Sequence, residues 1–307
     1  MGAPHHRDEF RRRARAHVAF DPFDVGPLAR FPGLFDRSAH DPADPARAVR
    51  SIFCRTDDLQ RARTDMVEIA ANERLLVIDF GMIVFIGDVE AIPDHKCAGT
   101  VVAFGLDRDI AVTTPWGERC GRCLVAPPGT VRRVVAGGRI AVCVIDPDVE
   151  LDPTFDVDDA ARALSEMSSE NVEAAWGSLL KALRRTARSE SLDPRVKAAV
   201  AALNASTSVP VAAARIADEL ALSLSRLEHL FAREIGTPMR SFRNWCRLRR
   251  AAEVLADGSD LTQAALAAGF YDQSHFNRTF RQSFGISPSF VFVGGTRIHV
   301  VRRNVPA

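Results

Sequence analysis

The sequence predicts a multidomain chain in which an antiparallel β sandwich or barrel is followed by a helical linker and an all-α region with two helix-turn-helix motifs. Three observations predict this fold class. Short β-branched runs separated by Gly, Pro and Asp turn signals fill residues 75–145. From Asp152 to about Phe290 the apolar residues recur at helical spacing. Within this helical part, the sequence matches itself at an offset of 49 residues.

The length of the chain allows two hydrophobic cores, and its charge is distributed unevenly between the two parts. A chain of 307 residues is long enough to bury two cores of ordinary size. Its 40 basic and 39 acidic residues are unevenly spread. The part from Ser191 to Ala307 holds 15 basic and 9 acidic residues, whereas the part before it holds 25 and 30. A basic C-terminal part favours nucleic acid as a partner.

The sequence also predicts the cellular compartment of the protein. No apolar run reaches the roughly 18 to 20 residues that span a bilayer. The basic N-terminus has no apolar stretch behind it, so it does not resemble a secretory signal. Six cysteines in so long a chain do not form a disulfide framework. We therefore expect a cytoplasmic protein without membrane contact.

The order of patterns along the chain predicts five segments. The first is rich in Asp-Pro and Arg and is expected to be loosely ordered, with a short helix over Asp57–Ala71 after it. The segments are a loose N-terminal segment (1–50), a β-rich domain (51–150), a helical linker (151–190), an all-α domain (191–293) and a tail (294–307).

The linker carries an apolar stripe with two interpretations. Trp176, Leu179, Leu180 and Leu183 lie at helical spacing. They predict either a seam with a second subunit, which would make a homodimer through residues 158–185, or a face that packs on the β-rich domain.

The internal repeat is the most informative feature. Ser223–Phe231 lies over Asp272–Phe280, and each copy begins with an N-cap residue and has Phe eight residues later. Each copy reaches a glycine thirteen residues after the cap, Gly236 and Gly285, which is a helix stop signal.

Each copy also follows a short predicted helix, Val211–Leu220 and Leu261–Ala268, across a tight turn. This is the helix-turn-helix pattern. A helix over Met239–Ala256, roughly 27 Å long, joins the two copies. A rigid connector of that length could set two recognition helices about one DNA turn apart, roughly 34 Å.

The second repeat and the connector carry a specific set of residues. They are Ala268-Gly269-Phe270, Asp272, Ser274-His275-Phe276, Arg278, Phe280, Gly285 and Ser287-Pro288, with Thr237-Pro238-Met239 and Arg247-Leu248-Arg249-Arg250-Ala251 in the connector. With these residues, about 100 residues of this region resemble the AraC/XylS family of transcription regulators. Two departures from the family pattern are Ser289-Phe290, where a Tyr-Arg pair is usual, and Ala221, where Gly is common.

The resemblance implies that both recognition helices read double-stranded promoter DNA. Its base-facing positions fall on Ser225, Glu228 and His229 in the first copy and on Gln273, Ser274, Asn277 and Arg278 in the second. Arg278 can pair with guanine, Gln273 or Asn277 with adenine, and Glu228 with cytosine.

Other arginines suit phosphates, and several residues have structural alternatives. The phosphate candidates are Arg226, Arg233, Arg240 and Arg281. Arg278 can also be structural in this family. Arg247, Arg249 and Arg250 are equally compatible with a solvated or acid-paired helix face. The leucines and phenylalanines of the repeat are predicted to be core.

The β region is similar to the cupin-like sensor domain that precedes this DNA-binding domain in many family members. Val125-Ala126-Pro127-Pro128-Gly129-Thr130, Gly138–Val142 and Ile145-Asp146-Pro147 carry this likeness. It implies a jelly-roll barrel with room for a small effector, which the sequence does not identify. An enzyme of that fold needs a His-x-His pair, and the matching strand offers His95 alone, so we expect neither catalysis nor a cofactor.

Cysteines provide a rival hypothesis. Cys120 and Cys123 have CxxC spacing, and His95 and Cys97 lie one hairpin away, which could hold zinc or form a thiol switch. On one strand, positions 120 and 123 would point to opposite faces, which favours ordinary packed thiols.

These observations together predict a sequence-specific transcription regulator that performs no covalent chemistry. Its predicted partners are double-stranded DNA, an unknown small effector and RNA polymerase. The alternative is a cupin-type enzyme, or a metal or thiol sensor, with a DNA-binding tail.

Overall fold

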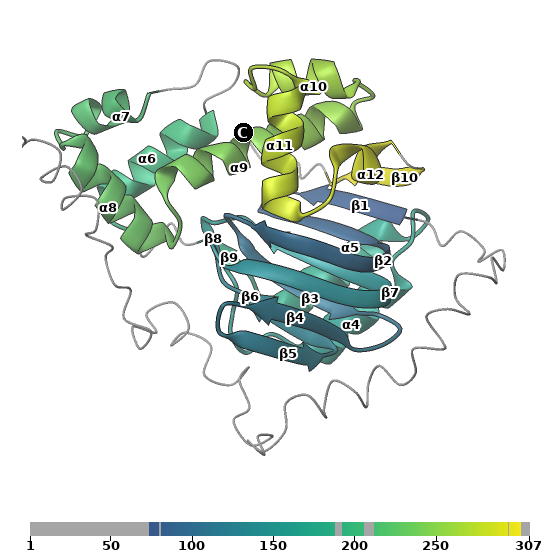
Figure 1. Ribbon diagram of the computed structural model, residues 1–307. Helices are drawn as coiled ribbons and strands as arrows, with labels where there is room; N and C mark the ends of the chain where they lie inside the picture. Colours follow the sequence, from purple (N-terminus) through teal and green to yellow (C-terminus); the bar gives the residue numbers. More distant parts are fainter. Residues whose placement is uncertain (1–73, 80, 188–191, 206–211, 294, 302–307) are drawn as a thin grey trace, which may run out of the picture.

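The computed structural model describes residues 74–79, 81–187, 192–205, 212–293 and 295–301. The predictions for residues 1–50 and for a helix over Asp57–Ala71 lie outside these ranges. In the described part, one large β-sheet lies below a group of helices (Figure 1). The sheet-rich part comes first in the chain and the helical part second, which confirms the predicted fold class.

The sheet contains eight strands of the described residues, in the order β10-β1-β2-β7-β3-β6, with β4 paired to β5 and β7. Every pairing in this sheet is antiparallel except that of β1 with β10. A separate pair, β8 and β9, follows it. The strands are β1 (Arg74–Asp79), β2 (Met82–Lys96), β3 (Thr100–Gly105), β4 (Ile110–Thr114), β5 (Gly117–Gly121), β6 (Cys123–Ala126), β7 (Val131–Ile145), β8 (Val149–Glu150), β9 (Thr186–Ala187) and β10 (Thr296–Val300).

Both faces of this sheet are apolar, because its strands have near-continuous apolar runs and not a simple alternation. In β1, Leu75 and Val77 point into one cluster and Leu76 and Ile78 into another. A sheet that is apolar on both sides must be covered on both sides. Two different helical units do this.

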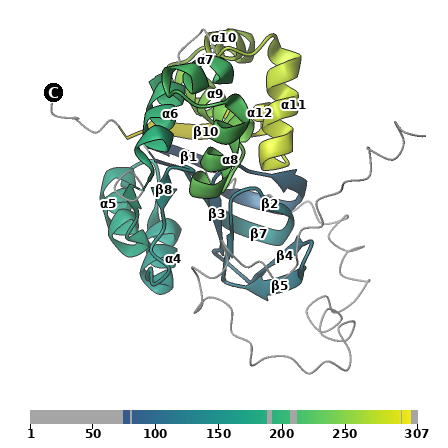
Figure 2. The same ribbon diagram turned by 90° about the vertical axis from the view of Figure 1, so that its left-hand side faces the viewer.

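The first face is covered by α4 (Val157–Glu166) and α5 (Val172–Leu183), which lie on one side of the sheet in Figure 2. Trp176, Leu179 and Leu183 are buried in this cluster, and Leu180 packs against it. The apolar stripe of the linker therefore packs on the sheet, which was the second of its two interpretations. It is not available as a seam between subunits.

The second face is covered by the connecting helix and by the helices of the second repeat. Trp245, Leu248, Phe276 and Phe280 share one cluster with residues of the sheet. The C-terminal helices are α6 (Pro194–Ala205), α7 (Ala213–Glu219), α8 (Leu224–Ile235), α9 (Met239–Ala256), α10 (Leu261–Ala267), α11 (Gln273–Phe284) and α12 (Pro288–Phe292).

The first repeat has a core of its own. Leu227, Phe231 and Ile235 of α8 pack with α6, α7 and the first turn of α9, where Met239 and Phe242 lie. Helix α9 is thus shared, because its start belongs to this core and its remainder to the cluster on the sheet.

Helix ends follow the predicted signals. Ser223 and Asp272 accept hydrogen bonds from backbone N–H groups at the starts of α8 and α11. Asp260 forms a capping box with Gln263 at the start of α10. Gly236 and Gly285 end α8 and α11 in the left-handed conformation, where glycine carries no Cβ penalty.

The C-terminal tail contains a strand that the sequence did not predict. β10 pairs in parallel with β1 from Arg74↔Thr296 to Ile78↔Val300. Ile298 and Val300 pack against the apolar cluster of the second face. The chain therefore returns to the N-terminal sheet after the helical domain, and β10 covers the edge that β1 would otherwise expose.

Removal of β10 tests this closure. A chain ending after Val293 is expected to lose about 3 kcal/mol of unfolding free energy, because it loses the apolar contacts of Ile298 and Val300 and the β1 hydrogen bonds. Urea denaturation measures the loss, and amide exchange should show faster exchange in β1. A chain ending after Val301 keeps the strand and serves as the control. Equal stabilities of the two truncated chains would contradict the role given to β10.

The turn of the first repeat carries a strained alanine. Ala221 has φ 53°, whereas the corresponding Gly269 has φ 78°. Left-handed backbone costs an alanine about 1 kcal/mol. Ala221→Gly is therefore expected to raise the unfolding free energy by about that amount. Ala198→Gly, at an exposed position inside α6, should lower it by about 1 kcal/mol. Loss of stability in both variants would show that the turn is not strained.

Candidate nucleic-acid interface

The first helix-turn-helix presents a polar face on α8. Buried Leu227 and Phe231 fix one side of the helix on its core, so the other side faces solvent. The predicted base-facing residues Ser225, Glu228 and His229 are all exposed. His229 donates from Nδ1 to the Ser225 carbonyl oxygen at 2.8 Å in one tautomer, which leaves its Nε2 pointing outward.

The second helix-turn-helix presents a less uniform face on α11. Ser274 and Arg278 are exposed, and Arg278 forms no ion pair with another described residue. Gln273 is half-buried, and its Oε1 accepts a hydrogen bond from Thr262 at 2.9 Å. Asn277 is also half-buried, and its Oδ1 has no partner among the described residues. Arg278 is therefore the residue of this helix most free to meet a base.

The predicted phosphate contacts lie on the surface. Arg226, Arg240 and Arg281 are exposed. Arg233 is exposed too and pairs with Glu234 at 3.0 Å, a surface pair that contributes little to stability. These side chains can all turn toward a backbone phosphate without leaving a buried partner.

The arginines of the connector divide into two groups. Arg249 pairs with Asp146 and lies 3.9 Å from Glu253, and Arg250 lies 3.8 Å from Glu253. For these two, the acid-paired interpretation is correct. Arg247 has no such carboxylate partner among the described residues.

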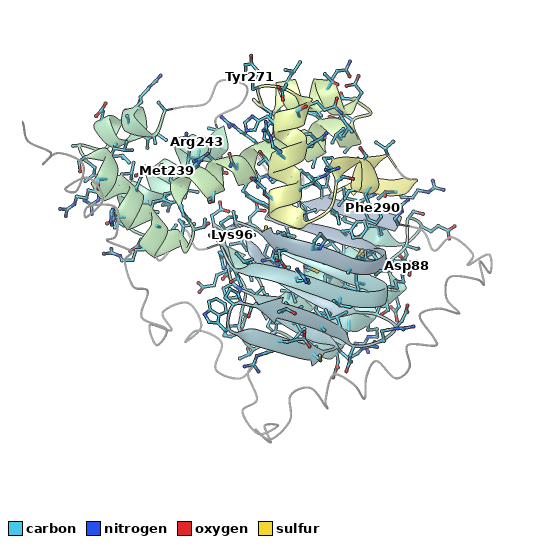
Figure 3. The ribbon with its side chains drawn as sticks, in the orientation of Figure 1. Asp88, Lys96, Met239, Arg243, Tyr271 and Phe290 are labelled. Atoms are coloured by element: carbon cyan, nitrogen blue, oxygen red, sulfur yellow. The ribbon has the colours of Figure 1, made fainter. Side chains whose placement is uncertain are left out.

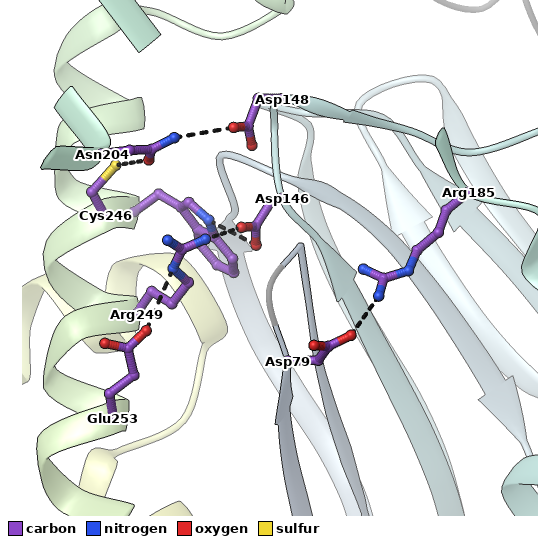
Figure 4. A network of polar contacts seen from close by, with 9 residues as sticks. Asp79, Asp146, Asp148, Arg185, Asn204, Cys246, Arg249 and Glu253 are labelled. Atoms are coloured by element: carbon purple, nitrogen blue, oxygen red, sulfur yellow. Dashed lines mark hydrogen bonds and ion pairs between the residues drawn. The ribbon is translucent and has the colours of Figure 1, made fainter. Parts of the chain in front are cut away.

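The contact between the sheet and α9 is polar at its centre. Asp146, at the end of β7, accepts hydrogen bonds from the Trp245 indole at 3.1 Å and from the Arg249 guanidinium (Figure 4). Nearby, Asn204 of α6 donates to Asp148 at 3.2 Å. Burial raises the pKa of Asp146 to about 6, against the opposing effect of the Arg249 charge. The ion pair therefore joins the two domains at a desolvated point.

The end of α11 rests directly on β2. A Cβ at Gly285 would lie 2.8 Å from the Pro93 carbonyl oxygen and 3.1 Å from Nδ1 of His95. Only glycine permits this approach and the φ of 74° that goes with it. Beside it, Arg74 of β1 donates to the Phe290 carbonyl oxygen at 3.0 Å and stacks on the Phe290 ring, where the helices meet the sheet (Figure 3).

The structure does not bring the metal candidates together. Among the described residues, no group of three or more His, Cys, Asp or Glu side chains could hold a metal ion. Cys120 lies on β5 and Cys123 on β6, with Cys120 exposed. Burial raises the pKa of Cys123 to about 12, which opposes formation of a reactive thiolate.

The other two metal candidates, His95 and Cys97, lie at the end of β2 and directly after it. Burial, with the charge of Arg132, lowers the pKa of His95 to about 4, so its ring is neutral at pH 7. Its Nδ1 donates to the Pro93 carbonyl oxygen at 2.8 Å in one tautomer. Cys97 is fully buried, and burial raises the pKa of its thiol against the opposing effect of the nearby Arg132 charge. Both side chains are thus structural.

Sequence reasoning missed Tyr271 at the second motif. It is the one tyrosine of the chain, lies in the turn before α11 and is 87% exposed (Figure 3). Its position directly before Asp272, the N-cap of α11, is the sequence signal that could have identified it as a surface residue of the second motif.

A cleft also lies near the second motif, where none was predicted. It measures about 330 Å³ between the end of α9, the start of α10, Gln273 and the end of α12. The cleft lies in the helical domain, whereas the sequence placed an effector in the sheet domain.

The comparisons with known proteins agree with this geometry. Residues 216–292 match a family model described as a helix-turn-helix domain. The arabinose operon regulatory protein of Escherichia coli is 35% identical over 77 residues, which are 25% of this chain and 26% of that protein. The regulatory protein Ada of Salmonella typhimurium is 33% identical over 91 residues, 30% of this chain and 26% of that protein. The chain thus spans about a quarter of the length of these curated relatives.

Among solved structures, the fold resembles that of apo ToxT from Vibrio cholerae. The TM-score is 0.50 at 12% identity, and the match covers 70% of this chain and 98% of that one. This likeness concerns the fold alone and includes both the sheet and the helices. In the described part of the chain, no helix combines the length and the apolar character that crossing a membrane requires.

The buried ion pair between the domains provides a prediction. Asp146→Asn leaves Arg249 buried without its carboxylate and is expected to cost about 3 to 5 kcal/mol of unfolding free energy. The control is Asp94→Asn, because Asp94 forms an exposed pair with Arg133 at 3.0 Å and should cost at most about 1 kcal/mol. Chemical denaturation measures both. Similar small losses in the two variants would show that Asp146 does not hold the domains together.

Proposed function

Since residues 216–292 form an AraC-type helix-turn-helix domain, we propose that this protein is a sequence-specific transcription regulator that binds promoter DNA through α8 and α11. One observation carries the proposal. Two capped helix-turn-helix units stand at the two ends of one uninterrupted helix of 18 residues, each with a polar, exposed face. A continuous helix fixes the separation of its ends, as adjacent major-groove segments require.

The chemistry of the exposed residues supports readout of bases. Arg278 offers a planar pair of donors that matches guanine O6 and N7, and Glu228 can accept from cytosine N4. Gln273 and Asn277 would first have to leave their half-buried positions to pair with adenine. We therefore assign the main sequence preference of α11 to Arg278.

Control by an effector would act through the contact between the sheet and the second motif. Helices α9 and α11 share an apolar cluster with the sheet, and Asp146 binds Arg249 across the same contact. A small molecule that binds the sheet domain differently in two arrangements would shift the position of α11 relative to α8. No covalent step is needed for this mechanism.

The remaining partners follow from the proposed role. A promoter-binding protein works where the DNA is, which for this chain we take to be the cytoplasm. RNA polymerase stays a predicted partner, because regulators of transcription act beside it on the promoter.

Replacing Arg278 tests base recognition. Arg278→Ala is expected to weaken binding to the cognate promoter by about 1 to 3 kcal/mol and to relax the preference at one base pair. Genomic footprinting of the bound protein supplies the site, and titrations with single-base variants measure the preference. Arg162→Ala, on α4 at the far face of the sheet, is the control. Unchanged affinity and unchanged preference would remove Arg278 from the site.

Replacing Arg233 tests a phosphate contact. Arg233→Ala is expected to weaken binding to all DNA sequences about equally and to reduce the slope of log affinity against log salt by about one. A change in sequence preference instead of slope would mean that Arg233 meets a base.

A further inference from the structure

We propose that Arg243 and Arg247 of α9 form a binding site for a phosphate group, which the DNA backbone supplies between the two segments read by α8 and α11. The identity of the ligand as DNA rests on the proposed function, whereas the site itself rests on the geometry of α9.

The two arginines form a pair on one side of the helix. They are four residues apart, so they lie one turn apart on the same face. Both are half-buried. Nε of Arg243 is buried and has no hydrogen-bond partner among the described residues. Neither side chain forms an ion pair with a described carboxylate, whereas Arg249 and Arg250 of the same helix both do.

This arrangement is electrostatically unbalanced. Burial lowers the pKa of Arg247, and the neighbouring charge of Arg243 lowers it further. Like charges one turn apart on a helix destabilise it. A bound oxyanion would relieve the repulsion and supply the missing acceptor. Two guanidinium groups match a phosphate in geometry as well as in charge.

The position of the pair also fits a phosphate of a duplex. Successive residues turn about 100° around a helix, so Arg243 and Arg247 each lie about 160° around α9 from Trp245, which faces the sheet. They lie about 120° and about 160°, respectively, from Arg249, which also faces the sheet. Figure 3 shows Arg243 on α9, among the helices and apart from the sheet. The pair is therefore directed away from the domain contact, in the first half of the connector.

When two helices occupy successive major-groove segments, the minor groove and its flanking phosphates lie between them. A cationic pair on the connector, between the two motifs, would therefore face phosphates and not base edges. It would contribute to affinity for any sequence and would fix the register of the two motifs.

The experiment compares the salt dependence of DNA binding in full-length variants. Arg243→Gln/Arg247→Gln is expected to reduce the slope of log affinity against log salt by about 1.8, at about 0.9 per phosphate contact. Its loss of affinity relative to the wild type should then shrink by about 12-fold between roughly 50 and 200 mM salt. The matched control, Arg162→Gln/Lys181→Gln, removes the same charge from α4 and α5 and should keep the wild-type slope.

A charge-conserving variant separates contact from folding. Arg243→Lys/Arg247→Lys keeps both charges and should retain most of the slope, because phosphate contacts tolerate a point charge. The glutamine variant should be as resistant to heat as the wild type or more so, since it removes a repulsion. A lower melting temperature in the glutamine variant, with the salt slope unchanged, would assign the arginines to the fold and overturn the proposal.

Inorganic phosphate is the second probe and needs no DNA. At constant ionic strength, about 10 mM phosphate should raise the melting temperature of the wild type and not of the glutamine variant. If phosphate acts in this way but the salt slope of DNA binding is unchanged, the ligand is a free phosphate compound and our DNA assignment is wrong. If the wild type binds no DNA at all, the proposed function fails, and the phosphate measurement alone decides whether the site exists.

Discussion

The need to cover both apolar faces of one sheet determines the rest of this structure. Helices α4 and α5 cover one face, and the second helix-turn-helix covers the other. A helical domain that folded independently of the sheet domain would bury its own apolar residues and would leave the second face of the sheet uncovered. Here, α9 and α11 complete the core of the sheet, so the second motif cannot leave without exposing a large apolar surface to water. Strand β10, which follows the helical domain in the chain, pairs with β1 and so attaches the helical domain to the sheet a second time.

The two helix-turn-helix motifs are consequently unequal. The first is an independent cluster of α6, α7 and α8, and it touches the rest mainly through the start of α9. The second is part of the sheet domain. A change in the sheet would therefore be felt first by α11, through Gly285 on β2 and through Asp146 on Arg249. Because α9 holds the first motif in place, a small displacement of α11 relative to α9 would change the position of α11 relative to α8, to which the fixed repeat of DNA is sensitive.

The local signals of the sequence predicted the helical domain closely. The caps at Ser223 and Asp272, the glycine stops and the span of α9 all follow from short-range chemistry that acts within a few residues. The long-range contacts were beyond such reasoning. Nothing in the five residues Thr296–Val300 shows that their partner is β1, more than 200 positions earlier, because an edge strand has no local signature. Likewise, the apolar stripe that contains Trp176 fits a subunit seam and a sheet equally well until the sheet is known to have two apolar faces that both need a cover.

The connector shows how one helix serves three environments at once. Its first turn completes the core of the first motif, the side with Trp245 and Arg249 binds the sheet, and the side with Arg243 and Arg247 bears unpaired charge. Arg249, on the sheet side, is paired with Asp146, and Arg250 lies near Glu253, so carboxylates of the protein offset both charges. Arg243 and Arg247 have no such carboxylate among the described residues. The phosphate ligand that we propose for Arg243 and Arg247 would supply, from outside the chain, the negative charge that the fold does not provide on the helix between the two motifs.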